Sequence, residues 1–311
     1  MIEIIKLTKK YGSFTALDSL SLQIEKGTVF GFVGQNGAGK STTFSILATL
    51  LAPTSGTAYI NGYNIQNEPK MVRGQLGYMP DFFGVYDQLK ASEYLHFYGA
   101  SYGIPFAERE KLIPQLLELV NLSHKKDAYV DLLSRGMKQR LCLARSLIHD
   151  PEVLILDEPA SGLDPRARVE MREILKELKM MGKTILISSH ILPELAEMCD
   201  SIGIIDQGKL VAEGAVADIH SKLQGERLII VKLVDEIADA IAFFEDEPNV
   251  SKLQLREDER SIQFIYKGSE GAQIELLKKA MVNQLQITSF SEVETNLEDV
   301  FMEITKGVEL L

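Results

Sequence analysis

Cysteine is nearly absent from the 311-residue chain, which contains only Cys142 and Cys199. Two cysteines exclude a disulfide-stapled fold, and both lie in apolar, helix-like sequence. We therefore interpret them as small buried side chains in a reducing compartment. Long hydrophobic runs are also missing. The most apolar stretch, FSILATLLAP at 44–53, is far shorter than the roughly 20 residues of a membrane-spanning helix.

The chain also lacks an excess of basic residues and a leader-like start. It has 33 Lys and Arg against 44 Asp and Glu, a net charge of -11 and a pI near 5.1. Binding to nucleic acid needs a basic surface, so we expect no nucleic-acid partner. The first residues, MIEIIKLTKKYG, have neither the apolar core nor the cleavage site of a secretory signal, and we expect none.

What is present is enough apolar sequence for a large core, 45% of the residues, and a length that predicts about two domains. Compact apolar runs that end in polar residues are typical of parallel strands buried on both faces. They are TVFGFVG (28–34), VLILDE (153–158) and TILISSH (184–190). Segments with helical spacing separate them, notably 40–50 and 165–181. The sequence therefore predicts an α/β fold.

Other strands are predicted to be antiparallel. Alternating apolar residues indicate half-exposed strands at 2–7 and 20–25, and a hairpin is expected over 201–214. From about 83 to 150 the pattern is mostly helical, with expected breaks at Gly99, Gly103, Pro105 and Pro114. We interpret this stretch as a helical subdomain inserted into the α/β core.

After residue 222 the sequence changes character. Predicted elements follow in the order strand, helix, strand, strand, helix, strand, at 227–233, 234–247, 250–257, 261–268, 272–284 and 285–294. This is the order of a ferredoxin-like α+β unit. A last helix is expected at 296–307. We therefore expect two domains, 1–220 and 221–311, and assign the second a regulatory or dimer-stabilising role as a hypothesis.

The strongest motif follows the first compact strand. Eight residues match G-x-x-x-x-G-K-[ST], namely Gly34, Gln35, Asn36, Gly37, Ala38, Gly39, Lys40 and Ser41. Glycines let successive backbone N–H groups point at one anion, and a helix N-terminus favours negative charge. Lys40 is expected to reach the β- and γ-phosphates of a bound nucleotide, Ser41 to bind Mg²⁺, and Thr42 to add a phosphate contact. A ligand-free turn is the weaker alternative.

Two carboxylates end the strand at 153–158. Ligands of open α/β sheets bind beyond the carboxyl ends of strands, where Asp157 and Glu158 stand. Asp157 suits the Mg²⁺ side of a nucleotide site. Glu158 suits a general base that activates the water attacking the γ-phosphate.

Three further motifs complete a resemblance to the ATP-binding cassette (ABC) ATPases. LSRGMKQRL (133–141) resembles the signature motif of that family, ASGLDP (160–165) its D-loop, and His190 its switch histidine. Order and spacing agree over about residues 1–220. The resemblance implies a P-loop core with an antiparallel β subdomain and an inserted helical subdomain at about 83–150.

The resemblance also implies roles for single residues. Two cassettes would pair head to tail, with ATP between the P-loop of one and the signature segment of the other. Ser134 and Gly136 would then contact the γ-phosphate of the partner's ATP. His190 would contact the γ-phosphate bound in its own chain, Asp164 would communicate across the dimer, and Tyr11 would stack on adenine. From the residues alone, Ser134 and Asp164 are also plain helix caps.

The sequence departs from the family at three positions. Arg135 and Met137 replace a glycine and a glutamine of the usual LSGGQ signature, and Asp81 replaces a glutamine that links metal and transport partner. An aspartate at 81 can still bind Mg²⁺ or water. These variants resemble the ABC-2-type exporter subgroup, whose cassettes carry a C-terminal extension.

The expected function is that of a transporter motor. The chain would hydrolyse ATP in the cytoplasm, peripheral to the inner face of the cell membrane, and power separate membrane-spanning subunits. Its second cassette would be a copy or a relative. We expect the aromatic segment 81–99 to contact the membrane subunit, so that truncating Phe82 and Phe83 uncouples hydrolysis from transport.

Two other functions compete with this one. A soluble ABC ATPase acting on ribosomes or DNA usually has two cassettes or a long coiled coil, whereas this chain has one P-loop and no sustained heptads. A GTPase or small-molecule kinase would leave the signature-like segment and His190 unexplained, and the chain has no N-K-x-D segment.

Overall fold

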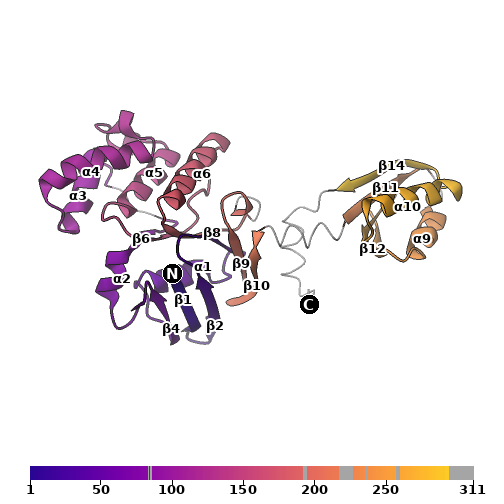
Figure 1. The fold of residues 1–311 in the computed structure, drawn as a ribbon, viewed down its shortest axis with the longest axis horizontal. Coiled ribbons are helices and arrows are strands. Elements are labelled where there is room, and N and C mark those ends of the chain that lie inside the picture. The colour runs from indigo at the N-terminus through magenta and orange to yellow at the C-terminus, as the bar shows by residue number, and fades with distance from the viewer. Residues whose placement is uncertain are drawn as a thin grey trace. The chain divides into compact units, whose positions relative to one another are not determined.

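The structure is a computed structural model that describes residues 1–82, 84, 86–191, 195–216, 227–234, 237–256 and 260–293. The chain divides into two compact units, Met1–Ala215 and Val216–Leu311 (Figure 1). Within the described residues, no helix is both long enough and apolar enough to cross a membrane.

The first unit contains two sheets. An antiparallel sheet has the order β2-β1-β4-β5, with β1 Ile2–Tyr11, β2 Phe14–Ile24, β4 Ser55–Ile60 and β5 Tyr63–Asn64. A second sheet has the order β10-β9-β3-β8-β7-β6, with β3 Val29–Val33, β6 Leu76–Met79, β7 Val153–Leu156, β8 Thr184–Ser189, β9 Ser201–Asp206 and β10 Lys209–Ala215. All pairs in the second sheet are parallel except β9 with β10.

The parallel sheet brings the ends of the predicted strands together. Every residue of β3, β7 and β8 is buried, as their continuous apolar runs indicated. Because β3, β8 and β7 are parallel neighbours, the segments that follow them meet at one edge. Helix α1 Lys40–Leu47 follows β3, and α6 Pro165–Met180 precedes β8.

A shared core joins the two sheets of this unit. Side chains from β1, β2 and β4 form one buried cluster with residues of the parallel sheet and α1. Phe32 of β3 and Phe44 of α1 stack within it at 6.0 Å between ring centroids. This packing fixes the position of the loop that connects β3 to α1.

The stretch from 83 to 150 is mostly helical, as predicted. It contains α3 Ala91–Ser101, α4 Phe106–Leu119 and α5 Arg135–Ser146, with single 3₁₀ turns at Ser123–Lys125 and Val130–Leu132. A short helix, α2 Pro69–Gln75, precedes β6.

Two predicted breaks in this stretch are wrong. Gly99 lies inside α3 and Pro114 inside α4. Gly99 serves close packing instead, because an added Cβ would lie 2.7 Å from the Arg109 side chain. Gly103 and Pro105 do separate α3 from α4, and Gly103 has a φ of 76°.

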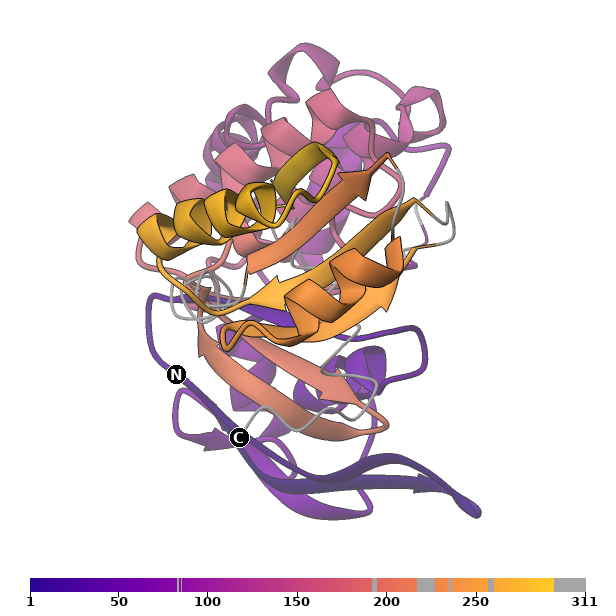
Figure 2. The ribbon, with the colours of Figure 1, turned by 90° about the vertical axis from the view of Figure 1, so that its right-hand side faces the viewer.

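The second unit is a four-stranded antiparallel sheet with two helices. Its strands are β11 Arg227–Leu233, β12 Val250–Leu255, β13 Ser261–Tyr266 and β14 Ile287–Val293, in the order β12-β13-β11-β14. Helices α9 Ile237–Glu245 and α10 Glu270–Val282 cover one face of the sheet (Figure 2). Phe244 and Phe264 meet in its buried core at 4.8 Å between ring centroids. This is the predicted ferredoxin-like arrangement; the helix expected at 296–307 lies outside the described residues.

Candidate functional site

A glycine-rich loop connects β3 to α1. Gly39 precedes α1 with a φ of 114°, a conformation that suits glycine. Gly34 packs so closely on β9 that an added Cβ would lie 2.6 Å from the Ile205 carbonyl oxygen. Between them Gln35, Asn36 and Gly37 are exposed. The loop thus presents exposed backbone at a helix N-terminus, where anions bind favourably.

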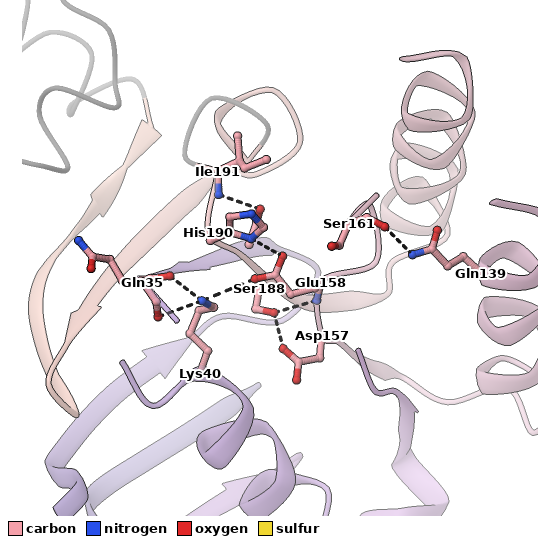
Figure 3. Close-up of polar contacts among 11 residues, drawn as sticks. Gln35, Lys40, Gln139, Asp157, Glu158, Ser161, Ser188, His190 and Ile191 are labelled. Atoms are coloured by element: carbon pink, nitrogen blue, oxygen red, sulfur yellow. Dashed lines mark hydrogen bonds and ion pairs between the residues drawn. The ribbon is translucent and has the colours of Figure 1, made fainter. Parts of the chain in front are cut away.

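Lys40 is buried beside this loop. Its ammonium group donates to the Gly34 carbonyl and lies 3.4 Å from that of Gln35. Its Nζ is also 3.6 Å from Oε1 of Glu158 (Figure 3). A buried ammonium group requires such partners, because burial without them disfavours the charged form. These contacts hold the Lys40 ammonium group at the mouth of the loop.

Asp157 and Glu158 follow β7 and are held by Ser188 of the neighbouring β8. The Ser188 hydroxyl donates to Oδ1 of Asp157 at 2.5 Å and accepts from the Glu158 backbone N–H at 2.9 Å (Figure 3). Burial raises the pKa of the Asp157 carboxyl, while hydrogen bonds from Ser188 and Ser41 act in the opposite direction. A cation placed beside Asp157 and Ser41 would stabilise the carboxylate that burial disfavours.

Glu158 and His190 form the remaining polar contact of the site. The Nδ1 atom of His190 lies 2.9 Å from Oε2 of Glu158 (Figure 3). Glu158 has a φ of 50°, which is uncommon for a residue with a side chain and is typical of strained functional positions. Glu158 therefore stands between an ammonium group and an imidazole.

These residues surround a cleft of about 350 Å³. Most of the predicted nucleotide-binding residues line it, namely Tyr11, Gln35, Asn36, Gly37, Gly39, Lys40, Ser41, Thr42, Asp81, Glu158 and His190. Gly34 and Ala38 are buried within the loop, and Asp157 is buried behind Ser41. An aromatic edge, a phosphate-sized loop and a lysine along one cleft fit a nucleoside triphosphate. The oxygens of Ser41 and Asp157 are of the kind that Mg²⁺ prefers.

The remaining predicted residues line a separate hollow of about 700 Å³. Ser134, Gly136, Met137 and Asp164 lie along it. Ser134 is the N-cap of α5 and accepts from the Met137 N–H at 3.3 Å. Asp164 is the N-cap of α6 and accepts from the Ala167 N–H at 2.9 Å. The structure thus gives both residues the helix-cap role, and their contact with a partner's nucleotide stays a prediction.

Sequence reasoning missed four residues of the site, one of which, Ala16 of β2, lines the cleft. Phe14 lines the cleft because it pairs with Tyr11 at the end of the β1–β2 hairpin. Ser161 lines it from the turn after Glu158. Ser188 lies in the buried strand β8, and the pairing of β8 with β7 places its hydroxyl within hydrogen-bond distance of Asp157. The hairpin register could have indicated Phe14.

A P-loop at a helix N-terminus, facing acidic residues that end another parallel strand of the same sheet, defines a P-loop nucleoside triphosphatase. The chain belongs to the ATP-binding proteins of the ABC transporter family and is an ABC ATPase. The model of the family "ABC transporter" matches residues 17–161. A second family model, "ATP-binding protein DrrA1-3-like, C-terminal domain", matches residues 214–305. The predicted family and fold are confirmed.

Relatives along the full length of the chain support this assignment. The linearmycin resistance ATP-binding protein LnrL of Bacillus subtilis is 33% identical over 98% of both chains. The bacitracin transport ATP-binding protein BcrA of Bacillus licheniformis is 35% identical, over 99% of this chain and 98% of the relative. A dimeric ATP-binding cassette, solved in a post-hydrolysis state with ADP and Pi, superimposes with a TM-score of 0.64. It is 25% identical, over 70% of this chain and 99% of that one.

Proposed function

We propose that this chain is the ATP-hydrolysing motor of an exporter, working at the inner face of the cell membrane on separate membrane-spanning subunits. The observation that carries the proposal is the contact of Glu158 with both Lys40 and His190 at the nucleotide cleft. The relatives named for linearmycin resistance and bacitracin transport support an export role.

We propose one step in hydrolysis for each of these side chains, and their geometry supports it. ATP entering the cleft draws the Lys40 ammonium group from Glu158 toward its β- and γ-phosphates. Glu158, still held by His190, accepts a proton from the water whose oxygen attacks the γ-phosphorus. The bond between the γ-phosphorus and the bridging oxygen breaks, and ADP and phosphate leave. When bound, Mg²⁺ at Ser41 and Asp157 neutralises phosphate charge.

We further propose that ATP closes two cassettes, the second being another copy of this chain. The hollow at Ser134 and Gly136 lies at the start of α5, where a helix N-terminus favours a phosphate. The Ser134 oxygen accepts within its own helix, which leaves its O–H free to donate to the γ-phosphate bound by the partner. The dimeric cassette among the solved relatives supports this arrangement.

The membrane contact is proposed to lie on the helical subdomain. In segment 81–99, Tyr94 and Leu95 belong to the core, whereas Phe82 is 90% exposed. Tyr86 and Phe97 are about half exposed and meet edge to face at 5.2 Å between centroids. Phe83 lies outside the described residues. We define Phe82, Tyr86 and Phe97 as the aromatic surface, which suits the core of a protein interface.

A larger cleft of about 870 Å³ lies between α4 and α6 of the same unit. Its apolar lining includes Leu112, Leu116 and Met181, and its acidic residues include Glu108 and Glu177. An amphipathic, basic cytoplasmic helix of the membrane subunit would complement both properties. We propose that such a helix occupies this cleft.

The catalytic assignment is tested with Glu158→Gln and Lys40→Ala. Glu158→Gln is expected to bind ATP normally but to lower kcat at least about 100-fold, because the general base is lost. Lys40→Ala is expected to weaken ATP binding itself. Phosphate release and binding of a fluorescent ATP analogue separate these effects.

Glu152→Gln is the matched control. Glu152 precedes the same strand β7 at its opposite end, is exposed and pairs with Lys26. This variant should hydrolyse ATP at the wild-type rate. Turnover retained by Glu158→Gln would remove Glu158 as the base and contradict the proposed mechanism.

A further inference from the structure

Arg135, the residue that replaces a glycine of the usual signature, lies against the D-loop segment of its own chain. It is exposed at the first position of α5. A methyl group built at Gly162 would lie 2.6 Å from the guanidinium carbon and from one of its nitrogens. The guanidinium group therefore covers the backbone of Gly162, whose φ of 67° is a turn conformation.

Two other contacts fasten the start of α5 to the same turn. Gln139, almost fully buried, donates from Nε2 to the Ser161 carbonyl at 3.1 Å (Figure 3). A Cβ added at Gly136 would lie 3.2 Å from side-chain atoms of both Leu163 and Ala167. The start of α5 and residues 161–167 are thus packed without space between them.

This turn leads directly to the general base. The Ser161 N–H donates to the Glu158 carbonyl at 3.0 Å, and the Leu163 N–H lies 3.3 Å from the Ala160 carbonyl. Ser161 also lines the nucleotide cleft. A displacement of Gly162 would therefore be transmitted through Ser161 to Glu158.

We infer that Arg135 is a positioning residue, which holds the turn at Ser161 and Gly162 against α5 and so keeps Glu158 in its productive place. The inference rests on the proposed function of Glu158. A guanidinium group suits this task because it is planar and weakly hydrated and can lie flat on a peptide plane. The signature segment is thereby coupled to the catalytic carboxylate of the same chain, in addition to any contact that it makes with a partner's nucleotide.

A double-mutant cycle of Arg135→Ala and Gly162→Ala tests this inference. The methyl group at Gly162 displaces the guanidinium group, so both single variants lose the same contact. The strain of alanine at a positive φ is present in both backgrounds and cancels in the cycle. We expect Gly162→Ala to reduce kcat at least about threefold more when Arg135 is present than in the Arg135→Ala background.

The split between kcat and KM separates positioning from direct contact with nucleotide. Arg135→Ala is expected to lower kcat about fivefold and to leave the KM for ATP within about twofold of wild type. Arg135→Lys keeps the charge but loses the planar group, and should be as slow as Arg135→Ala. Lys126→Gln, which removes an exposed charge from the helical subdomain, serves as the control and should match wild type.

Three results would overturn the inference: multiplicative effects in the cycle, a raised KM at unchanged kcat, or full rescue by Arg135→Lys. The KM and lysine comparisons decide the question even if Gly162→Ala fails to fold, because Arg135 is exposed. Glu158→Gln, assayed in parallel, keeps the two proposals apart. Hydrolysis that persisted in that variant would contradict the proposed function, whereas any of the three results with hydrolysis dependent on Glu158 would contradict only the role of Arg135.

Discussion

At the scale of single residues, the site depends on Ser188, a serine that is not itself a predicted ligand but holds the two predicted acidic residues. Ser188 bonds to both consecutive acidic residues, the Asp157 side chain and the Glu158 backbone. Its donation to Asp157 partly offsets the burial that raises the pKa of that carboxyl. Hydrogen-bond partners of this kind orient a carboxylate that is proposed to bind a metal ion.

Ser188→Ala is therefore expected to lower kcat by about 10–100-fold, which is the usual effect of removing such a partner. Affinity for ATP without Mg²⁺ should change little, because the P-loop is untouched. Steady-state phosphate release and nucleotide binding measure the two quantities. Ser101→Ala, in an exposed serine at the end of α3, is the control. Turnover within twofold of wild type in Ser188→Ala would show that Asp157 needs no support from β8.

Residues of the site were predictable where one local motif specifies them. The spacing of the P-loop located Lys40 and Ser41, and the apolar run before Asp157 located the acidic pair. Ser188 was missed because its importance arises from the pairing of β7 with β8, which no local pattern encodes, whereas the hairpin register could have indicated Phe14. The sequence predicted the helix caps at Ser134 and Asp164. It did not predict the contact of Arg135 with Gly162, which is a tertiary contact.

At the scale of elements, the buried parallel strands were the most predictable, since continuous apolar runs have few other uses in an α/β chain. Strands β4 and β5 and helix α2 were not predicted. They are short, and in β4 only Ala58 and Ile60 are fully buried. The helix breaks predicted at Gly99 and Pro114 do not occur, because tertiary packing of α3 and α4 outweighs the low helix propensity of these single residues.

The aromatic surface supplies the prediction at this scale. Phe82→Ala should leave ATP hydrolysis by the isolated chain within about twofold of wild type. In vesicles that contain the membrane subunit, the stimulation of ATPase by that subunit should fall at least about fivefold, as for an aromatic residue central to an interface. Leu50→Ala, an exposed apolar residue elsewhere on the first unit, is the control. Stimulation unchanged by Phe82→Ala would place the membrane contact elsewhere.

At the scale of the whole molecule, two observations bear on how the motor works. The nucleotide cleft and the hollow at Ser134 are separate, so one copy of the chain brings the P-loop and the signature to different places. A site that contains both then requires a second cassette. The net charge of -11 adds a long-range repulsion between two copies, so we expect closure to depend on contacts with bound nucleotide.

The most direct test of this account is the mass of the Glu158→Gln variant in solution, measured by light scattering with and without Mg-ATP. We expect the variant to bind ATP without hydrolysing it, so a closed pair should accumulate. We predict 34.7 kDa without nucleotide and twice that mass with Mg-ATP. The same variant carrying Ser134→Arg, which fills the signature hollow, should stay monomeric. A mass of 34.7 kDa with ATP bound would contradict the claim that two copies of this chain close on nucleotide.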